Sequence, residues 1–203
     1  SGALKVDQMA PLLVFFAEHL VNVSDVNTFS RDFKRTFQPD STQKANKTKI
    51  NWKEINEGIA IAQKEHKKLW IQTYDASCLT CTVMDSTIYK NEFLASYINE
   101  KYIPIKFNAM SKDTVKLQDK TFVNSNTSLN GYHQLFASAL NNQELKSPTL
   151  LIFDEQEQLL APVRSFMNLR YAEALATYFG ENKNKENVDF TQYIKTHDYQ
   201  SIK

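Results

Sequence analysis

Apolar positions in the first fifty residues predict two short helices followed by a linker. An apolar segment covers residues 9–23, in which Leu12–Leu20 can form a helix or a buried strand, and we favour the helix. Three phenylalanines between residues 29 and 37 recur every fourth position. This spacing places them on one face of a helix that starts near Ser30. The stretch 38–49 is polar and rich in turn-forming residues, as is typical of a linker. We therefore expect residues 1–49 to form a helical extension and linker.

From residue 50 onward, helical and strand patterns alternate. Asn51 can cap a helix with Glu54 at its third position, and the apolar residues that follow have helical spacing, which predicts a helix over about 52–66. The run of apolar, β-branched and aromatic residues at 69–74 predicts a buried strand. These two elements open an α/β pattern.

The alternation continues through the middle of the chain. Apolar spacing predicts a helix over 84–98 that is interrupted near Lys90, and residues 102–107 predict a second strand. Residues 109–130 are polar and poor in periodicity, so we expect a loop there before helical spacing resumes at 132–140.

The last part of the pattern predicts a hairpin, a helix and a charged tail. Residues 149–153 and 159–165 predict antiparallel strands, of which the second is an edge strand because it contains Pro162. Asn168 can cap a helix that ends at Gly180. In the tail, three apolar residues can anchor it to the domain surface: Phe190, Tyr193 and Ile194.

Composition and charge narrow the possible functions. The 203 residues are 42% hydrophobic and 12% aromatic, enough to bury a core. Positive and negative charges nearly cancel, to +1, and are spread along the chain, which argues against a nucleic-acid partner. No apolar run approaches the roughly 20 residues that cross a bilayer, so we expect no membrane span. The four glycines form no phosphate-binding loop, so we expect no nucleotide cofactor.

The first residues, Ser1-Gly2-Ala3, include neither an initiator methionine nor a basic segment. We therefore expect any export signal to be absent from this chain. Evidence on localisation must come from the chemistry.

The strongest chemical signal is the pair Cys78 and Cys81, which follows a predicted strand and opens a predicted helix. The amides and the dipole of a helix N-terminus favour negative charge, so the pKa of Cys78 should fall below the free value of about 8.5. Cys78 would then be the nucleophile, and Cys81 would resolve the mixed disulfide formed on it. Such a pair exchanges two electrons without another cofactor.

Two other interpretations of the cysteines are a structural disulfide and two reduced core thiols. A metal site would need two further ligands, and we expect none because the four histidines are scattered: His19, His66, His133 and His197. Exchange chemistry is favoured by the strand before the pair, the helix after it and the later Ser147-Pro148 before a strand.

Several segments between residues 50 and 182 are specific in their combined order and spacing. They are Asn51-Trp52-Lys53-Glu54, Lys68-Leu69-Trp70-Ile71, Cys78-Leu79-Thr80-Cys81 with Met84-Asp85, Ile103–Asn108, Gly131-Tyr132-His133, Ser147–Asp154 and Tyr178–Asn182. In this order they resemble the thioredoxin-fold superfamily, and in particular its exported bacterial thioredoxin-like (thiol:disulfide interchange) subgroup.

The resemblance implies an α/β thioredoxin-like fold. It predicts a central mixed sheet of four or five strands with helices on both faces, in a domain at 50–182 with an insertion before Ser147. Residues 1–49 would add the N-terminal helical extension, and residues 183–203 would form a C-terminal tail.

The resemblance also assigns roles at the site. Cys78 and Cys81 would be catalytic, and Pro148 would follow a cis peptide bond. Four residues would bind the substrate: Ser77, Ser147, Pro148 and Thr149. The activity implied is protein thiol–disulfide exchange, as a reductase or isomerase, with a partner reductase as the electron donor and the periplasm or another exported location as the setting.

Three departures from the family pattern favour a rival function. Ser77 stands where tryptophan is common, Gln72 replaces a buried acid, and Thr82 replaces a frequent lysine. The rival is a thioredoxin-fold binding or scaffold module whose disulfide is structural and has little redox activity.

Overall fold

The computed structural model describes residues 6–22, 24–37, 48–125, 131–141 and 145–202. Its internal contacts divide the chain into two units. One unit contains Ile50–Cys78 and Ser96–Arg164. The other contains Ser1–Lys49, Leu79–Ala95 and Ser165–Lys203. The boundary at 78/79 falls inside the cysteine motif.

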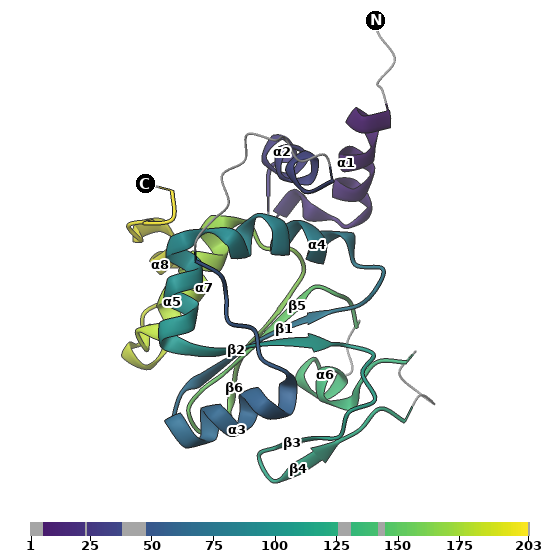
Figure 1. Ribbon diagram of the computed structural model, residues 1–203. Helices are drawn as coiled ribbons and strands as arrows, with labels where there is room; N and C mark the ends of the chain where they lie inside the picture. The colour runs from purple at the N-terminus through teal and green to yellow at the C-terminus, as the bar shows by residue number, and fades with distance from the viewer. Residues whose placement is uncertain (1–5, 23, 38–47, 126–130, 142–144, 203) are drawn as a thin grey trace, which may run out of the picture. The chain divides into compact units, whose positions relative to one another are not determined.

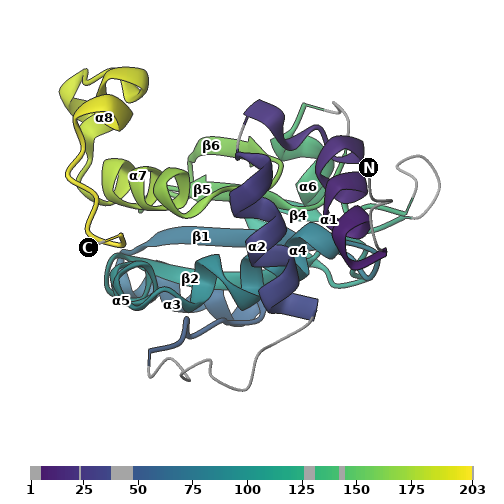
Figure 2. The ribbon, with the colours of Figure 1, turned by 90° about the horizontal axis from the view of Figure 1, so that it is seen from above.

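The first of these units is built on a four-stranded mixed sheet of β1 (Lys68–Tyr74), β2 (Tyr102–Asn108), β5 (Thr149–Phe153) and β6 (Leu159–Arg164). The strand order is β2-β1-β5-β6, and Figure 2 shows it from above. β1 is parallel to β2 and antiparallel to β5, and β6 is antiparallel to β5. The predicted mixed sheet is confirmed, and Pro162 lies on an edge strand as expected.

Helices flank this sheet within the same unit. The helix α3 (Ile55–Glu65) lies along one face of it (Figure 1). Apolar residues of α3, of the strands and of α6 (Gln134–Ala139) form one buried cluster. The central strand β1 is buried from Lys68 through Thr73, because neighbours cover it on both edges and its apolar side chains enter the core.

The predicted start of α3 was wrong. Lys53 is extended and pairs with β2: its amide donates to Pro104 O (2.9 Å) and its carbonyl accepts from the Lys106 amide (3.1 Å). These sheet contacts hold the backbone out of a helix until Glu54, which takes the N-cap position without a side-chain cap. Asn51 therefore caps nothing, and its amide instead donates to Asn99 Oδ1 (2.9 Å).

The polar stretch predicted as a loop contains a small hairpin, β3 (Val115–Leu117) and β4 (Lys120–Phe122). Gln118 and Asp119 make its two-residue turn, both with positive φ (53° and 58°). Because Val115 and Leu117 are the main apolar anchors, the pattern was too short to predict a strand. Part of the predicted loop, residues 126–130, lies outside the described residues.

The second unit includes two N-terminal helices, α1 (Val6–Ala17) and α2 (Val26–Phe37), with the 3-10 turn η1 (Leu20–Asn22) between them. The two predicted helices are confirmed. Phe29 of α2 is fully buried and packs against Phe15, at 5.7 Å between ring centroids, and Phe166, at 5.4 Å. Most of the predicted linker, residues 38–47, lies outside the described residues.

The remaining helices of this unit also follow the predicted pattern. The interrupted helix is α4 (Leu79–Ser86), η2 (Ile88–Lys90) and α5 (Glu92–Lys101), of which α5 continues into the other unit. Helix α7 (Leu169–Gly180) begins as predicted, with Asn168 Oδ1 accepting from the Tyr171 amide. The tail forms η3 (Lys183–Glu186) and α8 (Phe190–Thr196). Within the described residues, no helix is long and apolar enough to cross a membrane.

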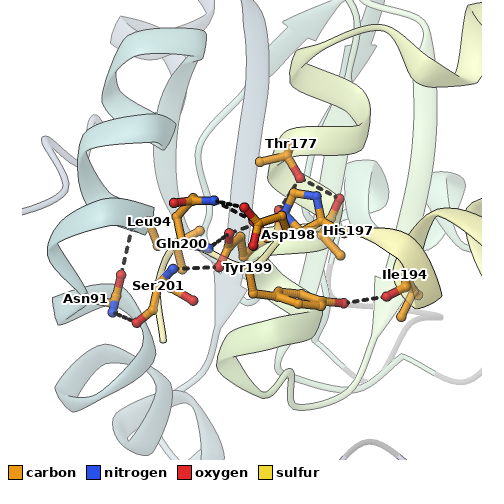
Figure 3. Close-up of polar contacts among 11 residues, drawn as sticks. Asn91, Leu94, Thr177, Ile194, His197, Asp198, Tyr199, Gln200 and Ser201 are labelled. Atoms are coloured by element: carbon orange, nitrogen blue, oxygen red, sulfur yellow. Dashed lines mark hydrogen bonds and ion pairs between the residues drawn. The ribbon is translucent and has the colours of Figure 1, made fainter. Parts of the chain in front are cut away.

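Two of the predicted anchors hold the tail against α7. The rings of Phe190 and Tyr193 lie 5.0 and 5.3 Å from the ring of Tyr178. Beyond α8 the chain returns to α7, where the fully buried Glu173 accepts from the Gln200 and Ser201 amides (2.6 and 3.0 Å). Figure 3 shows these last residues beside Asn91, whose side chain donates to Ser201 O (3.0 Å).

Candidate active site

The cysteine motif lies at the junction of a strand and a helix, as the sequence predicts. β1 ends at Tyr74, a turn follows, and α4 begins at Leu79, directly after Cys78. Both Cys78 and Cys81 are disulfide-bonded, and the described residues include no free cysteine. A disulfide at the start of a helix places the first sulfur beside amides that have no helical partner.

The two cysteines differ in exposure. Cys78 is partly exposed, whereas only 5% of Cys81 is accessible, because Cys81 lies one turn into α4. After reduction, reagents and substrates can therefore reach the first sulfur more easily than the second. Thiolates at helix starts are also the ones that the backbone stabilises.

The turn before Cys78 is organised by Asp75. Its Oδ1 accepts from the Ser77 amide (2.9 Å) and from the Ser77 hydroxyl (2.6 Å), while its carbonyl accepts from the Cys78 amide (3.2 Å). Burial alone would raise the pKa of Asp75. Hydrogen bonds from the Ser77 hydroxyl and amide outweigh burial, with help from the Cys78 amide, and lower that pKa. Asp75 is thus an anion at neutral pH.

The loop that contains Pro148 is fixed to β1. The Ser147–Pro148 bond is cis, as the resemblance implied. Thr149 and Thr73 are linked twice: the Thr149 amide donates to Thr73 Oγ1 (3.1 Å), which donates to Thr149 O (2.9 Å). The Thr149 hydroxyl donates to Lys146 O (2.7 Å) on the other side of the proline. These contacts set the backbone of the loop beside the end of β1.

Gln72 is a buried residue of β1 with 1% exposure. Its Nε2 donates to Thr73 O (3.1 Å) and to Thr149 O (3.3 Å). The amide thus links β1 to the strand after Pro148. Unlike a carboxylate, it has no capacity to accept a proton near neutral pH.

The structure brings several of the predicted site residues together. Ser77 contacts Asp75 in the turn before Cys78, and the cis Ser147–Pro148 bond lies in the loop that Thr149 joins to the end of β1. Thr149 is buried and serves the loop through its hydrogen bonds. The roles of all these residues in exchange stay predictions.

Two residues of this site were missed by the sequence analysis. Asp75 could have been found from its spacing to Ser77, because an aspartate two residues before a turn serine favours an Asx turn. No local pattern indicates Tyr132, which belongs to a distant loop. Burial raises the pKa of the Tyr132 phenol, and the Asp75 carboxylate raises it further.

The four histidines do not meet at this site. His133 caps α6, His66 ends α3, and His197 contacts Glu173. In the part of the chain that the structure describes, no three His, Cys, Asp or Glu side chains are grouped as a metal site requires.

Comparison with known proteins supports the same fold. Residues 37–133, slightly under half of the chain, match a family model named Thioredox_DsbH and described as "Protein of unknown function, DUF255". No curated protein matches the chain significantly by sequence.

Solved structures include similar folds. One is described as "a thioredoxin-fold protein from Helicobacter pylori"; it is 16% identical, with a TM-score of 0.51, over 64% of this chain and 84% of that one. Another, "DsbH Oxidoreductase", is 13% identical, with a TM-score of 0.40, over 78% of this chain and 93% of that one. The resemblance to thioredoxin-fold proteins is confirmed, as is the α/β class with a mixed sheet flanked by helices.

Proposed function

We propose that this thioredoxin-fold protein is a thiol–disulfide oxidoreductase that acts on protein disulfides through Cys78 and Cys81. The observation that carries the proposal is the disulfide at the β1–α4 junction, with its first cysteine partly exposed and its second buried. The matched family model, whose name refers to a thioredoxin-like protein, supports an oxidoreductase-like role.

As a reductase, the protein would start with both cysteines reduced. The Cys78 thiolate attacks one sulfur of a substrate disulfide; a Cys78–substrate disulfide forms, the substrate bond breaks, and the departing sulfur takes a proton. Cys81 then loses its proton and attacks the sulfur of Cys78. The second substrate thiol is released, so the substrate gains two electrons and the Cys78–Cys81 disulfide forms again. A partner reductase would return these two electrons to the pair. In an isomerase, another thiolate of the substrate would instead attack the substrate sulfur of the mixed disulfide. A new substrate disulfide would form, and the Cys78 thiolate would be released.

The substrate would lie along the loop at Pro148. In this proposal Ser147 offers its backbone to an extended substrate segment, the buried Thr149 supports the loop from below, and the small Ser77 leaves space beside Cys78. The link between Thr149 and Thr73 supports this role because it holds the loop in place before a substrate arrives.

The setting and the domain limits are part of the same proposal. The protein would act in the periplasm or another exported location, where protein disulfides are abundant. Residues 50–182 would form the thioredoxin-like domain, with the extension at 1–49 and the tail at 183–203.

A binding or scaffold module is the second candidate function. It is favoured by Gln72, whose amide is hydrogen-bonded in the core where a proton acceptor for Cys81 would be expected. In that case the disulfide would only fasten the start of α4.

Trapping of substrates tests the proposal. Without the resolving thiol, Cys81→Ser should accumulate mixed disulfides with a model protein that contains disulfide bonds. These mixed disulfides would be visible as mass adducts on Cys78. The matched control is Cys78→Ser, which should accumulate few, because its remaining thiol is buried. Equal trapping by both variants would reverse the assigned roles. No trapping by either, together with no equilibration of the wild-type pair with glutathione, would favour the scaffold module.

A further inference from the structure

The group that most directly borders the cysteine motif is an acid. α4 has no acidic residue in its first turn, and the turn before it contains Asp75, three residues before Cys78. Acids at helix starts usually stabilise the helix. Here the carboxylate precedes by three residues a cysteine whose function would require a thiolate, so a second negative charge would form close to the first.

The carboxylate is held in place rather than free to turn away. Ser77 binds it through both its amide and its hydroxyl, and these bonds join it to the residue next to Cys78. The Cys78 amide donates to the Asp75 carbonyl and also stabilises the carboxylate. No cation of the described residues forms an ion pair with Asp75.

Two other segments of the same unit lie near this acid. Burial and the Asp75 carboxylate both raise the pKa of the Tyr132 phenol, which stays neutral at physiological pH. The negative charge itself is held in the cysteine turn by the two hydrogen bonds from Ser77.

We propose that Asp75 is a positioning residue that sets the reduction potential of the Cys78–Cys81 disulfide, because its fixed charge opposes formation of the Cys78 thiolate. The inference rests on the proposed function and deepens it. Reduction of the disulfide adds two electrons and one proton, breaks the S–S bond, and leaves a thiolate at Cys78 and a thiol at Cys81. A charge that destabilises the thiolate destabilises the reduced form, so the protein is a stronger reductant than its motif alone would make it.

Two substitutions separate the effect of the Asp75 charge from the effect of the hydrogen bonds that form the turn. Asp75→Asn removes the charge but keeps an Oδ1 that accepts from Ser77. Asp75→Ala removes both. The matched control is Asp113→Asn, an exposed acid of the same unit that accepts from Ser111 (2.6 Å) and makes the same change in net charge.

Equilibration with glutathione measures the potential of each variant. Both Asp75 variants should favour the reduced form about 3- to 10-fold more than the wild type, a rise of about 15 to 30 mV. Asp113→Asn should match the wild type. If Asp75→Asn matches the wild type and only Asp75→Ala differs, the turn and not the charge sets the potential, and the inference is wrong. It is also wrong if neither variant differs.

A second readout distinguishes this inference from the proposed function. In a Cys81→Ser background, the pH dependence of alkylation reports the ionisation of Cys78 with no substrate present. Adding Asp75→Asn should shift that curve to lower pH by an amount that matches the glutathione result, and 1 M salt should shrink the shift. An unchanged curve overturns the inference. A shifted curve in a protein that reduces no protein disulfide sustains the role of Asp75 and contradicts the proposed function.

Discussion

His133 combines full burial with two hydrogen bonds that specify a neutral ring. Its Nδ1 accepts from the Leu135 amide (3.1 Å), so it caps α6, and its Nε2 is 2.8 Å from Asp113 O. Burial lowers the pKa of His133 below its ordinary value of 6.5, although the Asp113 carbonyl opposes the shift. The unfolded chain therefore binds a proton at a higher pH than the folded protein does.

This difference predicts a loss of stability in acid. The contribution of neutral His133 is present above the unfolded pKa and is lost as the pH falls through the folded pKa, at up to about 1.4 kcal/mol per pH unit. His133→Asn keeps a side chain that can cap a helix but does not titrate. The free energy of unfolding in urea, compared at pH 7.5 and 5.5, should fall less in this variant than in the wild type.

An exposed histidine provides the control for that measurement. His66 ends α3 with a positive φ of 51°, a conformation that asparagine tolerates. His66→Asn should retain the pH dependence of the wild type. An equal loss of stability in acid in the His133 and His66 variants would show that other groups cause it.

At the residue scale, the sequence could predict those features of the site that depend on residues close together in the chain. The two cysteines and the proline stand in short segments: the spacing of the cysteines favoured an exchange pair at a helix start, and the family resemblance implied the cis bond at Pro148. The partner of Gln72 was not predictable, because Thr149 lies 77 residues further along the chain. Whether Cys78 and Cys81 perform exchange stays a prediction.

At the scale of elements, Gly58 fixes how closely α3 approaches β2. A Cβ at this position would lie 2.4 and 2.6 Å from Cγ1 and Cδ1 of Ile105, and 3.3 Å from Cβ of Lys53. Ile105 is fully buried, so its side chain has little room to move. Gly58→Ala should therefore lower the free energy of unfolding by about 1 to 3 kcal/mol, although alanine favours a helix by about 1 kcal/mol.

Ala60 offers the comparison in the same helix. It is exposed, so Ala60→Gly should show the helix-propensity cost alone, about 1 kcal/mol. Urea unfolding of both variants separates the two effects. A stabilised Gly58→Ala protein would mean that α3 can move away from β2 without loss.

The same contact explains which elements the sequence could predict. Long periodic segments such as β1 and α7 were predicted closely, since their burial patterns repeat. The start of α3 was not, because pairing of Lys53 with β2 overrides the capping pattern at Asn51. The β3–β4 hairpin was missed because three-residue strands present too few apolar positions for a period to appear.

At the scale of the whole chain, one unit is assembled from three distant segments, and the buried Glu173 accepts hydrogen bonds from the last residues of the third. Glu173 accepts from the Gln200 amide, the Ser201 amide and His197 Nε2, the last at 3.2 Å. The Ser201 carbonyl in turn accepts from Asn91, in the second segment of the unit. Buried acceptors of this kind destabilise a protein strongly when their donors are removed.

Removing residues 199–203 should therefore destabilise the protein more than their few contacts suggest. The truncation leaves Glu173 buried with only His197 as a donor, at a cost of about 3 kcal/mol or more in the free energy of unfolding. Glu173→Leu in the truncated chain removes the buried carboxylate that has lost its donors and should recover most of that loss, so the two changes should be far from additive.

Removal of only Ile202, which is half-exposed, and Lys203 is the control and should change stability by less than about 0.5 kcal/mol. Urea unfolding of the wild type, the 199–203 truncation, Glu173→Leu in the full chain and the two changes together measures the coupling. Additive losses would mean that the last residues stabilise the protein by packing alone and that Glu173 does not hold them.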